Sequence, residues 1–249
     1  RPLPERQAAP HPPIPDDMNE PTMNIGMQLT ELLGLSHSPA AVKFQDTAPE
    51  GIPRVEQAAL SGCAYWKHAA EGKTFYTEAS DHYGCPIGSH THGIDLPEDT
   101  AKELEGLVGT MVELQYLAMD EVPEIPQREA PFGVAVYAPL SQATFAPDAV
   151  LIRGNARQIM LLAEAAHAAG IEIEGSVVGR PTCAAIPAVM KSGQSAANLG
   201  CIGNRVYTEM NDDEMYFVIS GDALEQVAGK LETIVNANHE LEKFHAGRS

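Results

Sequence analysis

The sequence predicts a layered protein of the α/β or α+β class, with a mixed sheet and packed helices. Short segments rich in β-branched and aromatic residues alternate along the chain with longer amphipathic segments. With 249 residues, of which 44% are hydrophobic, the chain is long enough to bury a large core. The alternation of the two segment types argues against a solenoid and against an all-helical bundle.

The chain opens with a proline-rich segment, which we expect to be an extended and disordered arm over residues 1–22. Seven of the 19 prolines lie in this segment, and it has no apolar stretch typical of a signal peptide. One globular domain is then expected over residues 23–249. No run of 18 apolar residues interrupts it, so the sequence predicts no membrane-spanning helix.

The segments before residue 130 are assigned from periodicity and from the residues that end them. Apolar residues at helical spacing predict a helix that stops near Gly34, and Pro97 followed by Glu98 and Asp99 is typical of a helix start. The segment YGCPIGSHTHG has the composition of a loop. We expect helices over 23–35, 55–70 and 98–107, strands over 39–44, 73–78 and 111–117, and a loop over 83–93.

The remaining segments follow the same logic. Asn155 is a good N-cap residue ahead of an apolar run that ends at Gly170, so the clearest helix of the chain spans 156–169. The terminal amphipathic segment starts at Asp222 and reaches the early 240s. We also expect strands over 133–138, 149–152, 171–178 and 213–219, and a further helix over 181–193.

The charge balance restricts the possible partners. With 34 acidic and 16 basic residues, the chain carries a formal net charge of −18. Such a surface repels nucleic-acid phosphates and anionic membranes, so neither is an expected partner. Small molecules or a redox partner remain open. We expect a cytoplasmic protein, and the sequence does not predict its oligomeric state.

The four cysteines form two pairs with similar surroundings. Cys63 and Cys85 lie in GCAYWKHAAEG and YGCPIGS, while Cys183 and Cys201 lie in TCAAIPAVMKSG and LGCIGNR. In both pairs a Cys-Ala step opens an expected helix, and a Gly-Cys step follows in an expected loop. We interpret this as an internal duplication into pseudo-symmetric halves, 23–130 and 131–249, whose packing could bring the thiols together.

Three interpretations of these cysteines stay open from spacing alone. Cys63, Cys85, Cys183 and Cys201 could ligate an iron–sulfur cluster, or zinc as an alternative, with flanking glycines that let backbone amides approach the sulfur atoms. They could be buried free thiols, because cysteine is among the most buried residue types. They could also form two disulfides. Neither pair has the tight spacing of zinc ribbons or ferredoxins.

Histidines and arginines near the cysteines are further candidates. His90 and His92 could ligate a metal with Cys85, although a solvated polar loop explains them equally. Arg180 and Arg205 lie beside the second pair and could bind a small anion or offset the charge of a cluster. The alternative for both arginines is an ordinary ion pair in a very acidic protein.

The segments GRPTCAAIP, LGCIGNR and DDEMYFVIS resemble the DUF169 family of uncharacterised proteins. LTELLGLSHSPAAVKF and the block from Cys63 to Cys85 are similar to the same family, so the resemblance covers nearly everything after the proline-rich arm. It implies a soluble prokaryotic protein whose pattern includes cysteines at the four positions above. It implies no activity.

Three functions therefore compete at the level of sequence. The leading hypothesis is a four-cysteine metal or iron–sulfur site with a redox role. The alternatives are a module or enzyme that binds a small anion without a metal, and a thiol–disulfide redox protein. No nucleophile–base pair stands out, so no catalytic residue is assigned and enzymatic activity stays undecided.

Overall fold

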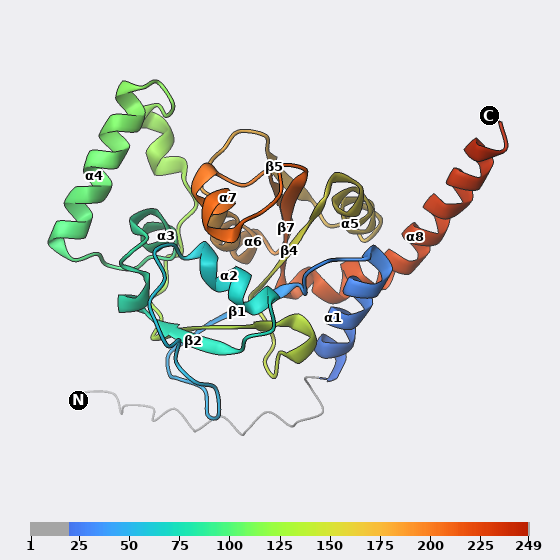
Figure 1. The fold of residues 1–249 in the computed structure, drawn as a ribbon, viewed down its shortest axis with the longest axis horizontal. Coiled ribbons are helices and arrows are strands. Elements are labelled where there is room, and N and C mark those ends of the chain that lie inside the picture. Colours follow the sequence, from blue (N-terminus) through green and yellow to red (C-terminus); the bar gives the residue numbers. More distant parts are fainter. Residues whose placement is uncertain (1–19, 249) are drawn as a thin grey trace, which may run out of the picture.

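The computed structural model describes residues 20–248, which form an α+β fold around one mixed seven-stranded sheet (Figure 1). The helices are α1 (Glu20–Leu33), α2 (Cys63–Ala70), α3 (Pro86–Thr91), α4 (Glu98–Glu113), α5 (Ala156–Ala168), α6 (Ala185–Ser192), α7 (Ile202–Thr208) and α8 (Leu224–Ala246). The strands are β1 (Ala40–Gln45), β2 (Phe75–Glu78), β3 (Val134–Pro139), β4 (Ala149–Asn155), β5 (Ile173–Ser176), β6 (Ser195–Asn198) and β7 (Glu214–Ser220).

The sheet is nearly symmetric about its centre. Its strand order is β2-β3-β1-β4-β7-β6-β5, and all neighbours pair antiparallel except β5 and β6. At the centre, Ala41 of β1 faces Val150 of β4. Outward from this pair, β3 and β7 occupy equivalent places, as do β2 and β6. We call the chain up to the end of β3 the first half of the protein, and the chain from the start of β4 onward the second half.

The register repeats this symmetry. Tyr137 of β3 pairs with Val42 on one side and with Phe75 on the other. In the second half, Val218 of β7 pairs with Leu151 and with Ala196. The sequence predicts a boundary between the halves at residue 130, which would place β3 in the second half although it pairs with β1 and β2. A boundary between β3 and β4 keeps these three paired strands together.

Alternate residues along each strand face two different helical layers. Val150 and Ile152 belong to a core with α1, α5 and α8, while Ala149 and Leu151 belong to a core with α2 and α6. This two-residue period is the one that strand geometry requires. Cys63 and Cys183 lie in the second core, so they occupy the same face of the sheet.

The predicted fold class is confirmed, and most expected elements are present with shifted ends. The helix at 156–169 begins where its cap predicts: the Asn155 side chain accepts from the backbone N–H of Gln158, whose side chain accepts from the Asn155 backbone N–H. This reciprocal pair satisfies two backbone donors that a helix start otherwise leaves free. α1 begins at Glu20, ahead of the expected start at Met23.

Two predictions in the first half of the chain are wrong. The expected loop over 83–93 contains α3, because Pro86 provides a favourable first helical residue after Cys85. The expected strand over 111–117 is the end of α4 and a turn. No proline interrupts that helix, which ends where Gln115 adopts a left-handed conformation with φ of 57°.

Two elements were not predicted. β6 and α7 lie in a segment, 194–212, whose short apolar stretches show neither a clear two-residue nor a 3.6-residue period. The arm expected over 1–22 falls outside the described residues except for its last three, which begin α1. Within residues 20–248, no helix has the length and apolar character needed to cross a membrane.

Candidate four-cysteine site

Each cysteine lies at the start of a helix on the same side of the sheet. Cys63 is the first residue of α2, and Cys183 lies in the short 3-10 turn Thr182–Ala184 that leads into α6. Cys85 and Cys201 are the residues that precede α3 and α7. The first half and the second half therefore each contribute one buried cysteine and one half-buried cysteine. We call Cys63, Cys85, Cys183 and Cys201 the four-cysteine site.

The four thiols converge. The pKa of Cys63 is raised to about 12, mainly by burial and to a smaller extent by the thiols of Cys85 and Cys201. Burial likewise raises the pKa of Cys183, with additional contributions from the other three thiols. Coulomb interactions weaken with distance, so these contributions place the thiols in the same region of the molecule. Two cysteines from each half of the chain thus lie in the same region, and all four are free rather than disulfide-bonded.

Hydroxyl groups surround the thiols on the side of the first half. The Ser61 hydroxyl lies 3.3 Å from the Cys63 sulfur and 3.7 Å from the Cys85 sulfur, so one buried side chain contacts both. Gly88 lies one helical turn after Cys85, and a Cβ atom there would come within 2.9 Å of the Cys85 sulfur. Glycine at this position leaves that thiol room.

The second half holds its cysteines differently. The Thr182 hydroxyl donates to Asn198 Oδ1 and accepts from the Cys201 backbone N–H at 2.9 Å. The backbone N–H of Asn204 donates to the Cys201 sulfur at 3.4 Å. The Asn204 side chain also contacts the Cys63 thiol, where it partly offsets the effect of burial on the pKa. Asn204 thus touches cysteines of both halves.

Several buried polar atoms beside the site have no hydrogen-bond partner among the described residues. They include both polar atoms of the Asn204 side chain and the Tyr137 hydroxyl. Tyr137 lies close enough to Cys63 and Cys183 for these thiols to contribute to the rise of its pKa, which burial causes mainly. An unpaired buried polar group costs about 1–3 kcal/mol. Such donors therefore favour an additional acceptor at this place.

Two histidines of the first half are buried near Cys85. His82 Nε2 bonds the Thr77 hydroxyl at 2.8 Å, and the His82 carbonyl accepts from the Cys85 N–H. The ring of His92 packs 5.6 Å from that of His82 and 5.4 Å from Phe44. Burial lowers the pKa of His82 to about 4 and that of His92 to about 3, so both rings are neutral at pH 7.

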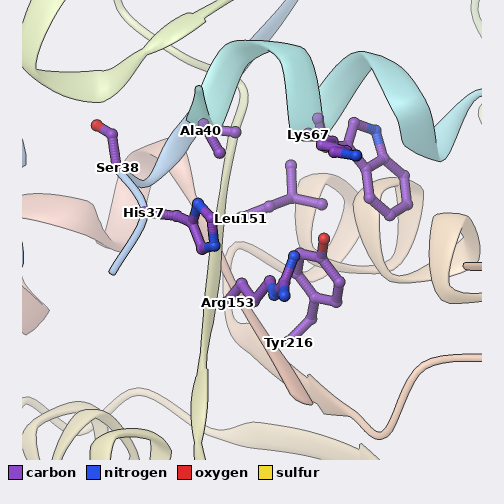
Figure 2. Close-up of a pocket in the computed structure, with 9 residues that line it drawn as sticks. His37, Ser38, Ala40, Lys67, Leu151, Arg153 and Tyr216 are labelled. Carbon is purple, nitrogen blue, oxygen red and sulfur yellow. The ribbon is translucent and has the colours of Figure 1, made fainter. Parts of the chain in front are cut away.

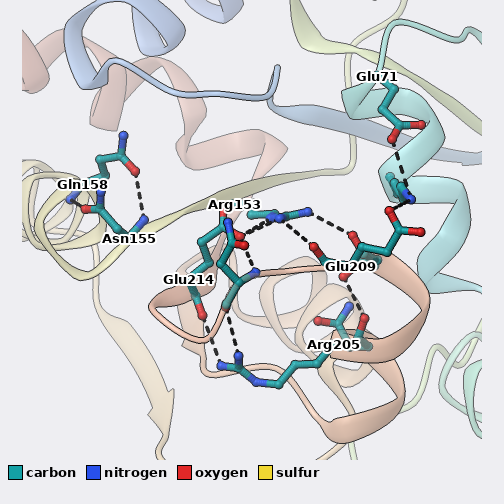
Figure 3. Close-up of polar contacts among 11 residues, drawn as sticks. Glu71, Arg153, Asn155, Gln158, Arg205, Glu209 and Glu214 are labelled. Atoms are coloured by element: carbon teal, nitrogen blue, oxygen red, sulfur yellow. Dashed lines mark hydrogen bonds and ion pairs between the residues drawn. The ribbon is translucent and has the colours of Figure 1, made fainter.

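The two arginines make internal contacts. Arg205 donates to the carbonyls of Leu199, Asn211 and Glu214, which ties both ends of α7 to β7 (Figure 3). Arg180 pairs with Glu121 at 2.8 Å and lies over the Tyr116 ring. These partners occupy the groups that an anion would need. The prediction of anion binding by Arg180 and Arg205 receives no support from this geometry.

A small pocket lies between α2 and the centre of the sheet (Figure 2), and none of the four cysteines lines it. Its cationic side chains are already paired. Lys67 bonds Glu209 at 2.6 Å, and Arg153 bonds Glu214 at 2.5 Å (Figure 3). The pocket is therefore not a site for an anion.

Comparisons with known proteins agree with the sequence motifs. The model of the DUF169 family, described as Uncharacterised ArCR, matches residues 28–230. The chain belongs to the DUF169 family. It is 25% identical over 225 residues to the Uncharacterized protein MJ0308 of Methanocaldococcus jannaschii, an alignment that covers 87% of this chain and 95% of that protein. No solved structure matches the chain significantly.

In this DUF169 protein, the four thiols lie in one region but do not form a binding site for a single metal ion. Across residues 20–248, no set of three or more His, Cys, Asp or Glu side chains is close enough to hold a single metal ion together. His90 and His92 therefore do not join Cys85 in such a set. A cluster places different demands on its ligands, because each thiolate binds a different iron and the sulfurs stand further apart.

Sequence reasoning identified the cysteines of this DUF169 protein but missed the polar residues around them. Ser61 and Thr182 each lie within two residues of a cysteine, and Asn204 lies three residues after Cys201. Tyr137 comes from a strand distant in sequence. The first three could have been found from their spacing to cysteine, whereas Tyr137 could be found only from the sheet register.

Proposed function

We propose that this DUF169 protein is an iron–sulfur redox protein whose cluster is held by Cys63, Cys85, Cys183 and Cys201. The proposal is supported by one geometric observation: the Ser61 hydroxyl contacts both the Cys63 and the Cys85 sulfur. In addition, buried Cys63 and Cys183, one from each half, lie within electrostatic range of each other. Four separately buried thiols would have no reason to converge across the two halves. Thiolate ligands are those that iron–sulfur clusters require.

The surroundings of the thiols fit such a group. Cluster and thiolate sulfurs accept hydrogen bonds, and the Asn204 amide and the Tyr137 hydroxyl are buried donors without acceptors among the described residues. Both lie within electrostatic reach of Cys63. A bound cluster would supply one-electron transfer. The protein's contribution would be to hold four thiolates, donate hydrogen bonds to sulfur and exclude water.

We infer iron–sulfur rather than zinc because a cluster binds each thiolate to a different iron and does not require four ligands around one point. A structural zinc ion needs four ligands around one point, and the described residues include no such set. The raised pKa values of Cys63 and Cys183 mean that both thiols hold their protons at pH 7 when no metal is bound. Because a buried thiol resists ionisation without a compensating charge, binding of iron would release these protons.

The surface next to the site suits a protein redox partner. Ile202 follows Cys201 directly and is 76% exposed, and Val206 lies one turn later on α7 with 63% exposure. These apolar side chains stand beside a half-buried ligand. Electron transfer across a short contact at this surface would need no small-molecule pocket. The pocket between α2 and the sheet includes none of the four cysteines.

Anaerobic reconstitution with iron and sulfide tests the proposal. We expect the wild-type protein to become brown and to bind about four irons per chain, as four thiolates and a cubane cluster require. Cys183→Ala and Cys85→Ala are expected to bind little or no iron. Ser192→Ala, at the exposed end of α6, should bind as the wild type does. Wild-type protein that stays colourless and free of iron would overturn the proposal.

A thiol–disulfide function is a second candidate, and one observation favours it. The Ser61 hydroxyl contacts both the Cys63 and the Cys85 sulfur, so these two thiols lie near one another. A disulfide between them would form by loss of two electrons and two protons to an external oxidant. Thiol counting before and after mild oxidation distinguishes this candidate, because iron-loaded protein would protect all four thiols.

A further inference from the structure

Asn204 is a buried side chain that touches the Cys63 thiol, yet its polar atoms form no well-aligned hydrogen bond among the described residues. It is 0% exposed, and neither its amide nitrogen nor its oxygen has a hydrogen-bond partner among the described residues. An unsatisfied buried polar group costs about 1–3 kcal/mol. A ligand that offers an acceptor to this amide would recover that free energy.

The position of Asn204 relates it to both halves of the four-cysteine site. It lies three residues after Cys201, whose sulfur accepts from its backbone N–H, and its side chain reaches the Cys63 thiol. Gly200 has a φ of 83°, and a Cβ atom there would come within 3.0 Å of Asn204 Oδ1. The chain thus holds this amide tightly against the thiols.

The first half lacks this donor. Gly88 lies three residues after Cys85, in the place that Asn204 occupies relative to Cys201. A side chain at that place would collide with the Cys85 sulfur, so the first half cannot supply an equivalent amide. The two halves share a backbone plan, but only the second half carries a side-chain amide at the site.

We propose that the Asn204 side-chain amide donates a hydrogen bond to a sulfur of the cluster site and thereby raises its reduction potential. The inference rests on the function proposed above. When the site takes up one electron from an external one-electron donor, its sulfurs become more negative and accept hydrogen bonds more strongly. The amide stabilises this reduced form, and no covalent bond breaks and no proton moves.

The test is the reduction potential of reconstituted Asn204→Leu, which keeps the shape of the side chain and removes the donor. At a fixed solution potential we expect its ratio of reduced to oxidised cluster to fall about tenfold, equivalent to about 59 mV for one electron. Asn238→Leu on α8, far from the thiols in sequence and on another helix, is the matched control and should leave the ratio unchanged.

A second measurement does not depend on the folding of the variant. Wild-type protein labelled with asparagine that carries 15N only in the side-chain amide should show a weak nitrogen coupling to the reduced cluster in pulsed electron paramagnetic resonance, because the backbone N–H of Asn204, which donates to the Cys201 sulfur, then carries no label. Asn204→Leu that binds the cluster at an unchanged potential, or wild-type protein without the coupling, overturns the role of Asn204 alone. Wild-type protein that binds no cluster overturns the proposed function and the inference together.

Discussion

The two halves of the sheet follow one plan, yet they surround their cysteines with different side chains. In the first half, Ser61 contacts both thiols and two buried neutral histidines lie behind Cys85. In the second half, Thr182 and Asn204 hold Cys201 through its backbone and its sulfur. The similar order of strands and helices brings the thiols together. The different side chains determine how a substitution in each half affects iron binding and stability.

The largest expected effect comes from removing a thiol in either half. If the halves form one site, Cys63→Ala and Cys201→Ala should each reduce the iron bound after anaerobic reconstitution to roughly a tenth of the wild-type amount or less, because a cluster needs all its ligands. Iron analysis measures this directly. Retention of half the iron in each variant would instead indicate two separate sites, one in each half.

Acid should destabilise the protein through the histidines of the first half. Folding lowers the pKa of His82 to about 4 and that of His92 to about 3, from an ordinary value of 6.5. Between these values the unfolded chain binds more protons than the folded one. The free energy of unfolding should therefore fall as the pH drops below about 6.5, by about 1.4 kcal/mol per pH unit for each histidine.

His92→Phe tests this acid effect by removing one of the two buried bases while keeping a ring. The slope of unfolding free energy against pH, measured by urea denaturation between pH 6.5 and 4.5, should decrease by about 1.4 kcal/mol per unit. His167→Gln, on the exposed side of α5, is the control. An unchanged slope in His92→Phe would contradict the assignment of acid sensitivity to the first half.

Arg205 should matter for the stability of the second half. Its guanidinium donates to three carbonyls on both sides of α7, so Arg205→Ala leaves these acceptors without their charged donor. We expect a loss of about 2 kcal/mol in unfolding free energy, measured by urea denaturation. Arg180→Ala, which breaks one ion pair at the surface, should cost much less.

Anions provide a further check on both arginines. If either arginine bound a small anion instead, phosphate or sulfate would raise the melting temperature of the wild type and not that of Arg205→Ala or Arg180→Ala. We expect equal shifts in all three proteins. A shift confined to the wild type would restore the anion-binding function that the internal contacts of the two arginines disfavour.

Gly88→Ala adds only one methyl group. It tests whether the cysteines of the two halves differ in the space around their sulfur atoms. The added methyl group would come within 2.9 Å of the Cys85 sulfur, which must rotate away. We expect about 1 kcal/mol of lost stability and a lower yield of iron on reconstitution. Gly203→Ala, where a Cβ atom meets nothing within 4 Å, is the matched control in the second half. Full iron binding by Gly88→Ala would show that the Cys85 thiol has room to spare.

The sequence was informative where a local signal has one physical meaning. The N-cap at Asn155 and the apolar periods of α1, α5 and α8 predicted helices that the structure contains. The sequence was misleading over 83–93, where glycine, serine and histidine predicted a loop. Pro86, a residue favoured at the first position of a helix, begins α3 there.

Other features depend on tertiary structure and could not be predicted. The segment over 111–117 resembles a strand, yet α4 extends into it past Gly106 and Gly109, which do not end this helix. The neutrality of His82 and His92 follows from burial between packed elements, and the contact between Asn204 and Cys63 joins residues of different halves. None of these has a signature in the local sequence.

Native mass spectrometry of anaerobically purified protein tests most directly whether the two halves form one redox site. We predict one species per chain whose mass exceeds that of the polypeptide by a single iron–sulfur cluster, and loss of this species in Cys63→Ala and in Cys201→Ala. A wild-type chain at the mass of the bare polypeptide, of the disulfide form or of a zinc complex would contradict the proposal.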